Sequence, residues 1–130
     1  SFIFNENTLN NKFENDYWGI SLKEIVNKIN NYEKIDFSKK KVVGICGFYH
    51  ENFLIELKKY PKLNIEYVSI YNQDRKLDYV ITNNRSLYLK RDGGNPKKWM
   101  NCNDYYNGET LIEVRTNKVA LSKLKIVDHD

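Results

Sequence analysis

The turn at residues 44–47, Gly-Ile-Cys-Gly, lies between an apolar run and a helical pattern, where a dinucleotide-binding fold keeps its phosphate loop. That fingerprint needs a third glycine three residues later. Phe48, Tyr49 and His50 follow instead, and the chain has no phosphate-binding loop of the G-x-x-x-x-G-K-S/T type. The two glycines therefore indicate a special backbone geometry. The alternative stays open that the chain is a free-standing small α/β module binding a nucleotide or similar ligand at residues 44–50.

Nucleophilic and metal-binding residues are scarce. Cys46 and His50 could form a nucleophile–base couple, but their spacing matches no nucleophile motif. The other histidine is His129, next to the last residue, so no second histidine is available to build a metal site with His50. The acidic residues are dispersed, mainly at turns and at the ends of elements. We therefore predict no catalytic residue, no metal site and no cofactor in this chain.

The two cysteines, Cys46 and Cys102, lie far apart in the sequence, and neither belongs to a C-x-x-C pair. This excludes the usual zinc and thioredoxin-type sites. Two interpretations stay open. The cysteines form a disulfide if the compartment is oxidising and the geometry allows it. Otherwise they are independent thiols, and Cys46 packs as a small hydrophobe at the end of an apolar strand.

The composition describes a folded chain with a modest positive charge. Apolar residues make up 41% of the 130 residues, which argues against a disordered segment. The net charge is +4, and the basic residues are mostly lysines spread along the sequence, so nucleic acid is not expected as a partner. The lysine excess favours a solvated surface, with a weak attraction to anionic lipid head groups as the alternative. No stretch approaches the roughly 20 apolar residues that cross a membrane.

The hydrophobic periodicity predicts one soluble α/β domain over residues 1–130, with residues 1–15 as an irregular segment. Ser21 to Glu24 has the pattern of a capping box and is followed by the apolar stripe of a helix. The next expected elements are a strand at 41–46, a helix at 51–60, strands at 64–71 and 77–82, and a hairpin of 109–115 with 119–127. The helix at 51–60 is expected to bury one apolar face of Phe53, Leu54, Leu57 and Tyr60. Residues 83–108 show no clear pattern. The predicted fold is α/β, a small Rossmann-like layered sheet, mostly parallel, with helices packed on it and a C-terminal antiparallel β-hairpin.

Residues 13–24 form the most distinctive segment, which ends in Asp-Tyr-Trp-Gly-Ile-Ser-Leu-Lys-Glu at residues 16–24. Packing alone explains it, because Tyr17 and Trp18 can cover the start of the helix. The segment also resembles the point where bacterial multi-spanning membrane glycosyltransferases leave the bilayer. These enzymes depend on polyprenyl-phosphate sugars and are similar to protein mannosyltransferases. Residues 78–85 resemble a late strand and loop of that family, and residues 110–127 resemble its terminal strand pair.

The resemblance implies a non-catalytic C-terminal domain on the extracytoplasmic (periplasmic) face of a bacterial inner membrane. The catalytic carboxylates of that family belong to its membrane part, so no catalytic residue is carried over. The implied partners are the membrane-embedded part of the same polypeptide and a glycan or lipid-linked acceptor. Asp16, Tyr17 and Trp18 are the candidate binding residues, although a structural role is the favoured interpretation. The first residue is Ser1 rather than Met, which fits a piece of a larger protein.

Overall fold

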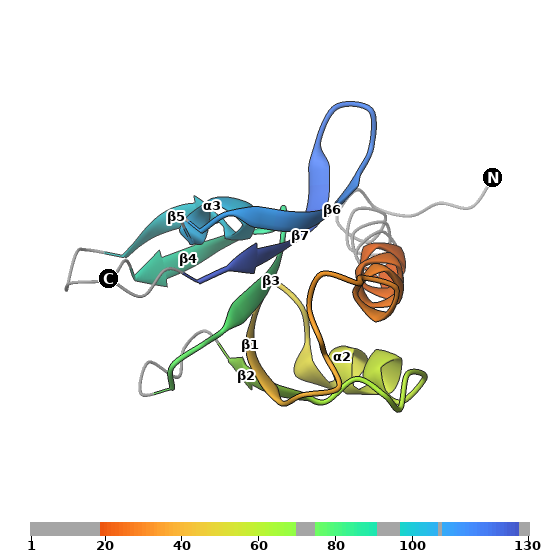
Figure 1. Cartoon of the computed structure of the whole chain (residues 1–130). Helices are drawn as coiled ribbons and strands as arrows, with labels where there is room; N and C mark the ends of the chain where they lie inside the picture. Colours follow the sequence, from red (N-terminus) through yellow and green to blue (C-terminus); the bar gives the residue numbers. More distant parts are fainter. Residues whose placement is uncertain (1–18, 70–74, 91–96, 107, 128–130) are drawn as a thin grey trace.

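A computed structural model describes residues 19–69, 75–90, 97–106 and 108–127 (Figure 1). Residues 19–30 are helical. The elements that follow are β1 (Lys41–Cys46), α2 (His50–Leu57), β2 (Ile65–Ser69), β3 (Tyr79–Asn83), β4 (Ser86–Lys90), β5 (Lys97–Asn101), α3 (Cys102–Tyr105), β6 (Thr110–Arg115) and β7 (Ala120–Ile126). The segment expected to be irregular, residues 1–15, and the candidate residues Asp16, Tyr17 and Trp18 lie outside the described residues.

A mixed five-stranded sheet with the order β2-β1-β3-β7-β6 forms the centre of the fold. β1 runs parallel to both β2 and β3, whereas β7 runs antiparallel to both β3 and β6. The α/β class is confirmed, but the parallel pairing expected for most of the sheet is confined to one edge. The connections explain the difference. α2 gives a crossover long enough for parallel pairing of β1 and β2, while residues 116–119 alone join β6 to β7 and allow only antiparallel pairing.

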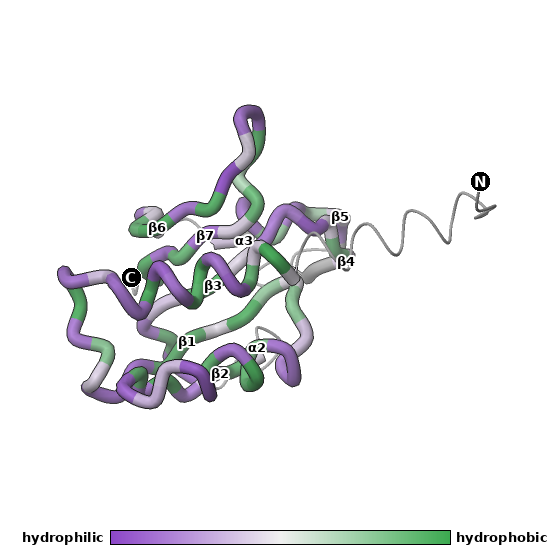
Figure 2. The backbone as a smooth tube through the Cα atoms, turned by 90° about the vertical axis from the view of Figure 1, so that its right-hand side faces the viewer, coloured by the Kyte–Doolittle hydropathy of each residue, from purple (hydrophilic) through white to green (hydrophobic). Residues whose placement is uncertain are grey.

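The helix of residues 19–30 and α2 cover the same face of this sheet (Figures 1 and 2). The predicted apolar stripe of the first helix is confirmed, since all four of its members are buried: Leu22, Ile25, Val26 and Ile29. They share one hydrophobic core with Val43 and Ile45 of β1, Ile81 of β3 and Phe53 of α2. Side chains alternate between the two faces along a strand, so Val43 and Ile45 point toward the helices together.

The predicted capping box at Ser21 is wrong. Gly19 and Ile20 are already helical, which places Ser21 inside the helix rather than at its N-cap. The Ser21 side chain is buried, and its Oγ has no hydrogen-bond partner among the described residues. Serine at this position is explained by its small volume at a packed interface, because tertiary contacts override a local capping pattern.

The opposite face of the sheet carries a second, smaller cluster. Cys46, Val80 and Cys102 are fully buried there, with Leu87 of β4 and Met100 of β5 packed against them. Cys46 and Cys102 form a disulfide with a Cα–Cα distance of 5.7 Å, which decides between the two interpretations of the cysteines. The bond ties the end of β1 to the start of α3 and so holds the two-stranded β4–β5 sheet to the main sheet.

No helix in the described part of the chain is both long enough and apolar enough to span a bilayer.

Candidate binding groove

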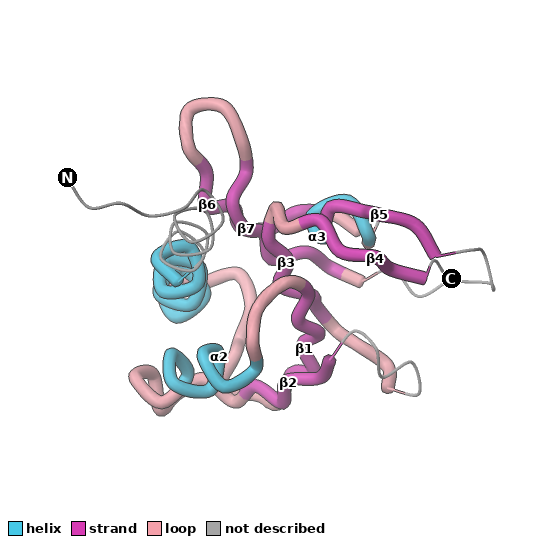
Figure 3. Tube along the Cα trace, turned by 180° about the vertical axis from the view of Figure 1, so that it is seen from behind, coloured by secondary structure: helices cyan, strands magenta, loops and turns pink. Residues whose placement is uncertain are grey.

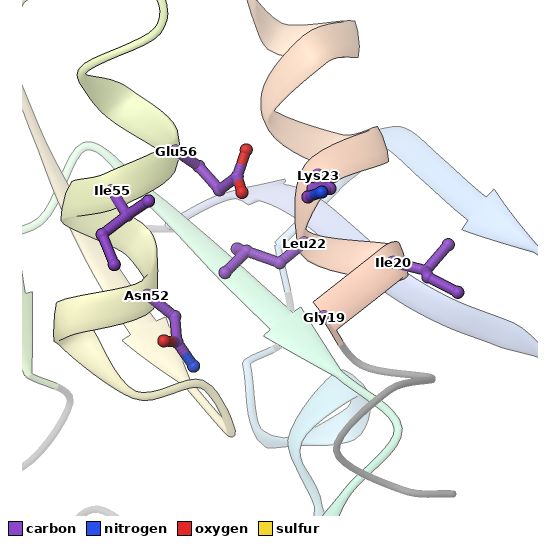
Figure 4. Close-up of a pocket in the computed structure, with 7 residues that line it drawn as sticks. All are labelled: Gly19, Ile20, Leu22, Lys23, Asn52, Ile55 and Glu56. Carbon is purple, nitrogen blue, oxygen red and sulfur yellow. The ribbon is translucent and has the colours of Figure 1, made fainter.

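A groove of about 490 Å³ lies between the helix of residues 19–30 and α2 (Figure 4). Its volume falls within the range of roughly 300–1,000 Å³ that is usual for ligand sites. Leu22 and Glu56 project into the space between the two helices, whereas Ile20 points away from α2. The residues that line the groove are Gly19, Ile20, Leu22, Lys23, Asn52, Ile55 and Glu56.

The rim of the groove carries apolar side chains that are exposed to solvent. Ile20 is 60% exposed and Ile55 is 55% exposed, although both are large aliphatic side chains. Tyr49, just before α2, and Leu54, on α2, are also exposed. These four make up most of the large hydrophobic side chains that the described residues leave exposed, and they are gathered on two neighbouring elements. Such a concentration is typical of an interaction surface.

Glu56 is the buried charge on the groove wall. Its two carboxylate oxygens accept hydrogen bonds from Lys59 Nζ at 3.1 and 3.0 Å. Lys23 lines the same groove from the first helix. Because Lys59 balances its charge, Glu56 provides a polar edge rather than an unpaired acid.

Sequence reasoning missed the groove face of α2. It expected one apolar face containing Phe53 and Leu54, but Leu54 is exposed and Glu56 is buried. Asn52, Ile55 and Glu56 have the i, i+3, i+4 spacing that places residues on one side of a helix. That spacing was the available signal. An analysis based on hydrophobicity does not detect this face, because two of its three residues, Asn52 and Glu56, are polar.

The strand-to-helix turn has a structural explanation for both of its glycines. Gly47 adopts a φ of 94°, and a Cβ there would lie 2.0 Å from Asn83 Oδ1. Asn83 Nδ2 donates a hydrogen bond to the Gly47 carbonyl at 2.8 Å, and Asn83 Oδ1 accepts one from Arg85 N at 2.9 Å. A Cβ at Gly44 would lie 2.6 Å from Leu77 Cδ1. The glycines therefore make room for neighbouring side chains, in agreement with the predicted role in backbone geometry.

The space at this turn is small. A cavity of about 30 Å³ is bounded by Gly47, Phe48, Tyr49 and Arg85, together with three residues of the larger groove. That volume is close to the share of one water molecule in liquid water, roughly 30 Å³. The turn thus bounds a small cavity beside the groove rather than a nucleotide-sized pocket.

His50 and Cys46 are not a nucleophile–base couple. The Cys46 sulfur is bonded to Cys102, so no thiol is available. The His50 ring stacks on Tyr67 with the ring centroids 5.8 Å apart, and its Nε2 lies 3.1 Å from Glu51 Oε1. His50 therefore packs over the edge of the sheet. Within the described ranges, no three metal-ligating side chains come together.

A buried cluster of polar side chains attaches α3 to the main sheet, on the face opposite the helix of residues 19–30 and α2. Thr82 Oγ1 donates to Asn103 Oδ1 at 2.6 Å, and Asn103 Nδ2 donates to the Ala120 carbonyl at 3.0 Å. Lys125 Nζ donates to the carbonyls of Asn103 and Tyr106. Burial, followed by the charge of Lys123, lowers the pKa of Lys125. Each of these contacts joins α3 or the residue after it to β3 or β7, so the cluster attaches α3 to the main sheet.

Residues 16–24, which carry the resemblance to the glycosyltransferases, are described from Gly19 onward, and this described part lines the groove. Asp16, Tyr17 and Trp18 fall outside the described residues, but Gly19, next in sequence, lines both cavities. Comparisons of the chain with protein-family models, with curated proteins and with solved structures found no match.

Proposed function

We propose that this chain is a non-catalytic extracytoplasmic domain of a membrane glycosyltransferase, and that its groove docks the membrane-embedded part of the same polypeptide. The observation that carries the proposal is the exposed apolar rim of the groove, to which the first helix contributes Ile20 and α2 contributes Ile55. An apolar groove between helices suits an amphipathic protein segment, which inserts side chains at helical spacing. Docking there would hold the domain in a fixed position and help to place the acceptor.

Two further features support this assignment. The Cys46–Cys102 disulfide fits an oxidising compartment outside the cytoplasm. The parallel strands β2, β1 and β3 with the α2 crossover form what we infer to be a Rossmann-like half, in which β1 and β3 define a switch point. Gly47 and Arg85, which follow the carboxyl ends of those two strands, line the small cavity that shares Gly19, Leu22 and Asn52 with the groove. Sheets of this kind commonly bind their partners at that place.

The alternative, a nucleotide-binding module at residues 44–50, has weaker support. The cavity at the turn measures about 30 Å³, and the Asn83 side chain fills the space beside Gly47 and donates a hydrogen bond to its carbonyl. A nucleotide titration followed by amide NMR distinguishes the two functions. Shifts confined to residues 44–50 would favour the module, whereas their absence agrees with the docking role.

The first experiment is to sequence the gene upstream of the codon for Ser1. We expect several apolar stretches of membrane-spanning length in the same reading frame. A start codon at or just before Ser1 would refute the proposal.

The second experiment places a photo-crosslinking residue at Ile55 in the full-length parent protein. We expect an internal crosslink to the membrane-embedded part, mapped by mass spectrometry. The matched control is the same residue at Val119, which is also an exposed aliphatic but belongs to the loop between β6 and β7. Equal crosslinking from both positions, or crosslinks from Ile55 to unrelated proteins only, would contradict docking at the groove.

A further inference from the structure

The small sheet of β4 and β5 presents an exposed aromatic pair. Tyr88 lies directly opposite Trp99, and Leu87 lies opposite Met100. Leu87 and Met100 face inward and pack against the disulfide cluster, so the alternation of side chains directs Tyr88 and Trp99 outward. Their ring centroids are 5.7 Å apart. Tyr88 is 55% exposed and Trp99 is 72% exposed.

This outward face is unusual for a surface sheet. An antiparallel sheet that packs one face on a core normally turns polar side chains toward water on the other. Here the outer face carries the two largest aromatic types, although the inner face is already apolar. Figures 1 and 3 place β4 and β5 on the side of the main sheet away from the helix of residues 19–30 and α2. The aromatic pair is therefore remote from the binding groove.

The same two strands concentrate the positive charge of the chain. β4 and β5 contain Lys90, Lys97 and Lys98 and no acidic residue. Residues 91–96, outside the described part, add one arginine and one aspartate and so no net charge. The segment thus contributes +3 of the net charge of +4, and strand pairing sets Lys90 opposite Lys97. Lysines that look dispersed in the sequence are brought together by this pairing.

We propose that the outward face of the β4–β5 sheet, with Tyr88 and Trp99 paired on it and the paired lysine positions 90 and 97 next in register, rests on an anionic lipid surface. Trp and Tyr are the side chains that prefer the boundary between the hydrocarbon and the head groups of a bilayer, because each has a large apolar ring and one polar group. Lysines beside them attract anionic head groups. Neither strand supplies an acidic residue that could neutralise the lysines, so an anionic surface is the complementary partner. This inference does not depend on the groove or on the family of the parent protein.

The test is flotation of the purified chain with two kinds of vesicle. One kind contains phosphatidylcholine alone, and in the other phosphatidylglycerol replaces part of it. We expect binding to the anionic vesicles only, weakened by added salt. Trp99→Ala should weaken this binding about tenfold, the effect of removing one large buried apolar side chain. Lys97→Glu should weaken it by about fivefold or more, since position 97 shares the strand face of Trp99 and each lysine near an anionic surface contributes roughly that factor.

Matched controls come from the loop between β6 and β7. Val119→Ala removes apolar surface and Lys118→Glu reverses a charge at exposed positions outside the proposed face, and both should leave vesicle binding unchanged. Circular dichroism verifies that every variant is folded. In a Trp18→Phe background Trp99 is the only tryptophan, and its emission should shift to the blue on anionic vesicles but not on neutral ones.

Several results would overturn the inference. Absence of vesicle binding, equal binding to both vesicle types, or unchanged binding by Trp99→Ala would each do so. So would self-association or glycan binding that requires Trp99 without any vesicle binding, because the face would then serve another partner. A parent protein without membrane spans would sink the proposed function but not this one. Failed flotation would leave the crosslink from Ile55 untouched.

Discussion

Reduction of the Cys46–Cys102 disulfide should lower the stability of this domain by a predictable amount. The bond joins residues that are 56 positions apart. Closing a loop of that length in the unfolded chain removes conformational entropy equivalent to about 4 kcal/mol at 25 °C. A domain of this size has a total stability of about 5–15 kcal/mol, so the loss is a large fraction of it.

The assay is urea unfolding of the wild-type protein with and without reductant. Reduction leaves all side-chain atoms in place, so the difference isolates the crosslink from any cavity. With a urea dependence of about 2 kcal/mol/M, the midpoint should fall by about 2 M on reduction. Titration of thiols in denaturant should find none before reduction, because neither cysteine is free.

The control is the double variant Cys46→Ala/Cys102→Ala, whose midpoint should not respond to reductant. Both cysteines are fully buried, so this variant should also be less stable than the reduced wild type because two small voids are added. A midpoint shift below about 0.5 M in the wild type would refute the loop-closure argument. Reactive thiols in the native, unreduced protein would refute the bond itself.

Two other predictions concern the turn and the edge of the sheet. Gly47→Ala should destabilise the domain by about 2 kcal/mol or more, since it combines a φ of 94° with a Cβ 2.0 Å from Asn83 Oδ1; a thermal midpoint equal to that of wild type would contradict it. Hydrogen bonds from Arg75 and then from Lys40 lower the pKa of Glu66 from 4.5 to about 2. The depressed pKa stabilises the folded state above pH 4.5, and that contribution is lost as the pH falls from 4.5 through 2. Over that interval the thermal midpoint of the wild type should fall more steeply than that of Glu66→Gln, and parallel curves would show that the ion pairs contribute nothing.

The hydrophobic periodicity of the sequence was sufficient to predict a helix or strand where one face of that element is buried. The stripe from Leu22 to Ile29 and the apolar run of β1 follow helical and strand periodicity, and the structure buries both. The fold class followed from the order of these elements. The balance of parallel and antiparallel strands did not, because it depends on which distant strands pair. β7 lies beside β3 although about forty residues separate them, and no local pattern encodes that pairing.

The parts that were missed depend on contacts between distant residues. Residues 83–108 look irregular because the two strands there are stabilised by packing on a disulfide, and sequence alone could not establish the Cys46–Cys102 bond. The groove lies between the helix of residues 19–30 and α2, and Glu56 is buried there with Lys59 as its ion-pair partner. Ser21 was misassigned because a capping pattern can also occur inside a helix that starts earlier.

The Asn83 side chain fills the space that a side chain at position 47 would need, so the two positions should evolve together. The Asn83 amide occupies the place of the missing Cβ and fixes the carbonyl that leads into α2. Leu77, just before β3, and Gly44, within β1, share space in the same way. Substitutions at either member of a pair must therefore be accompanied by a change at the other, so the two pairs should covary in related chains. We therefore expect related chains either to keep glycine at 44 and 47 with Leu77 and Asn83 or to change both members of a pair together.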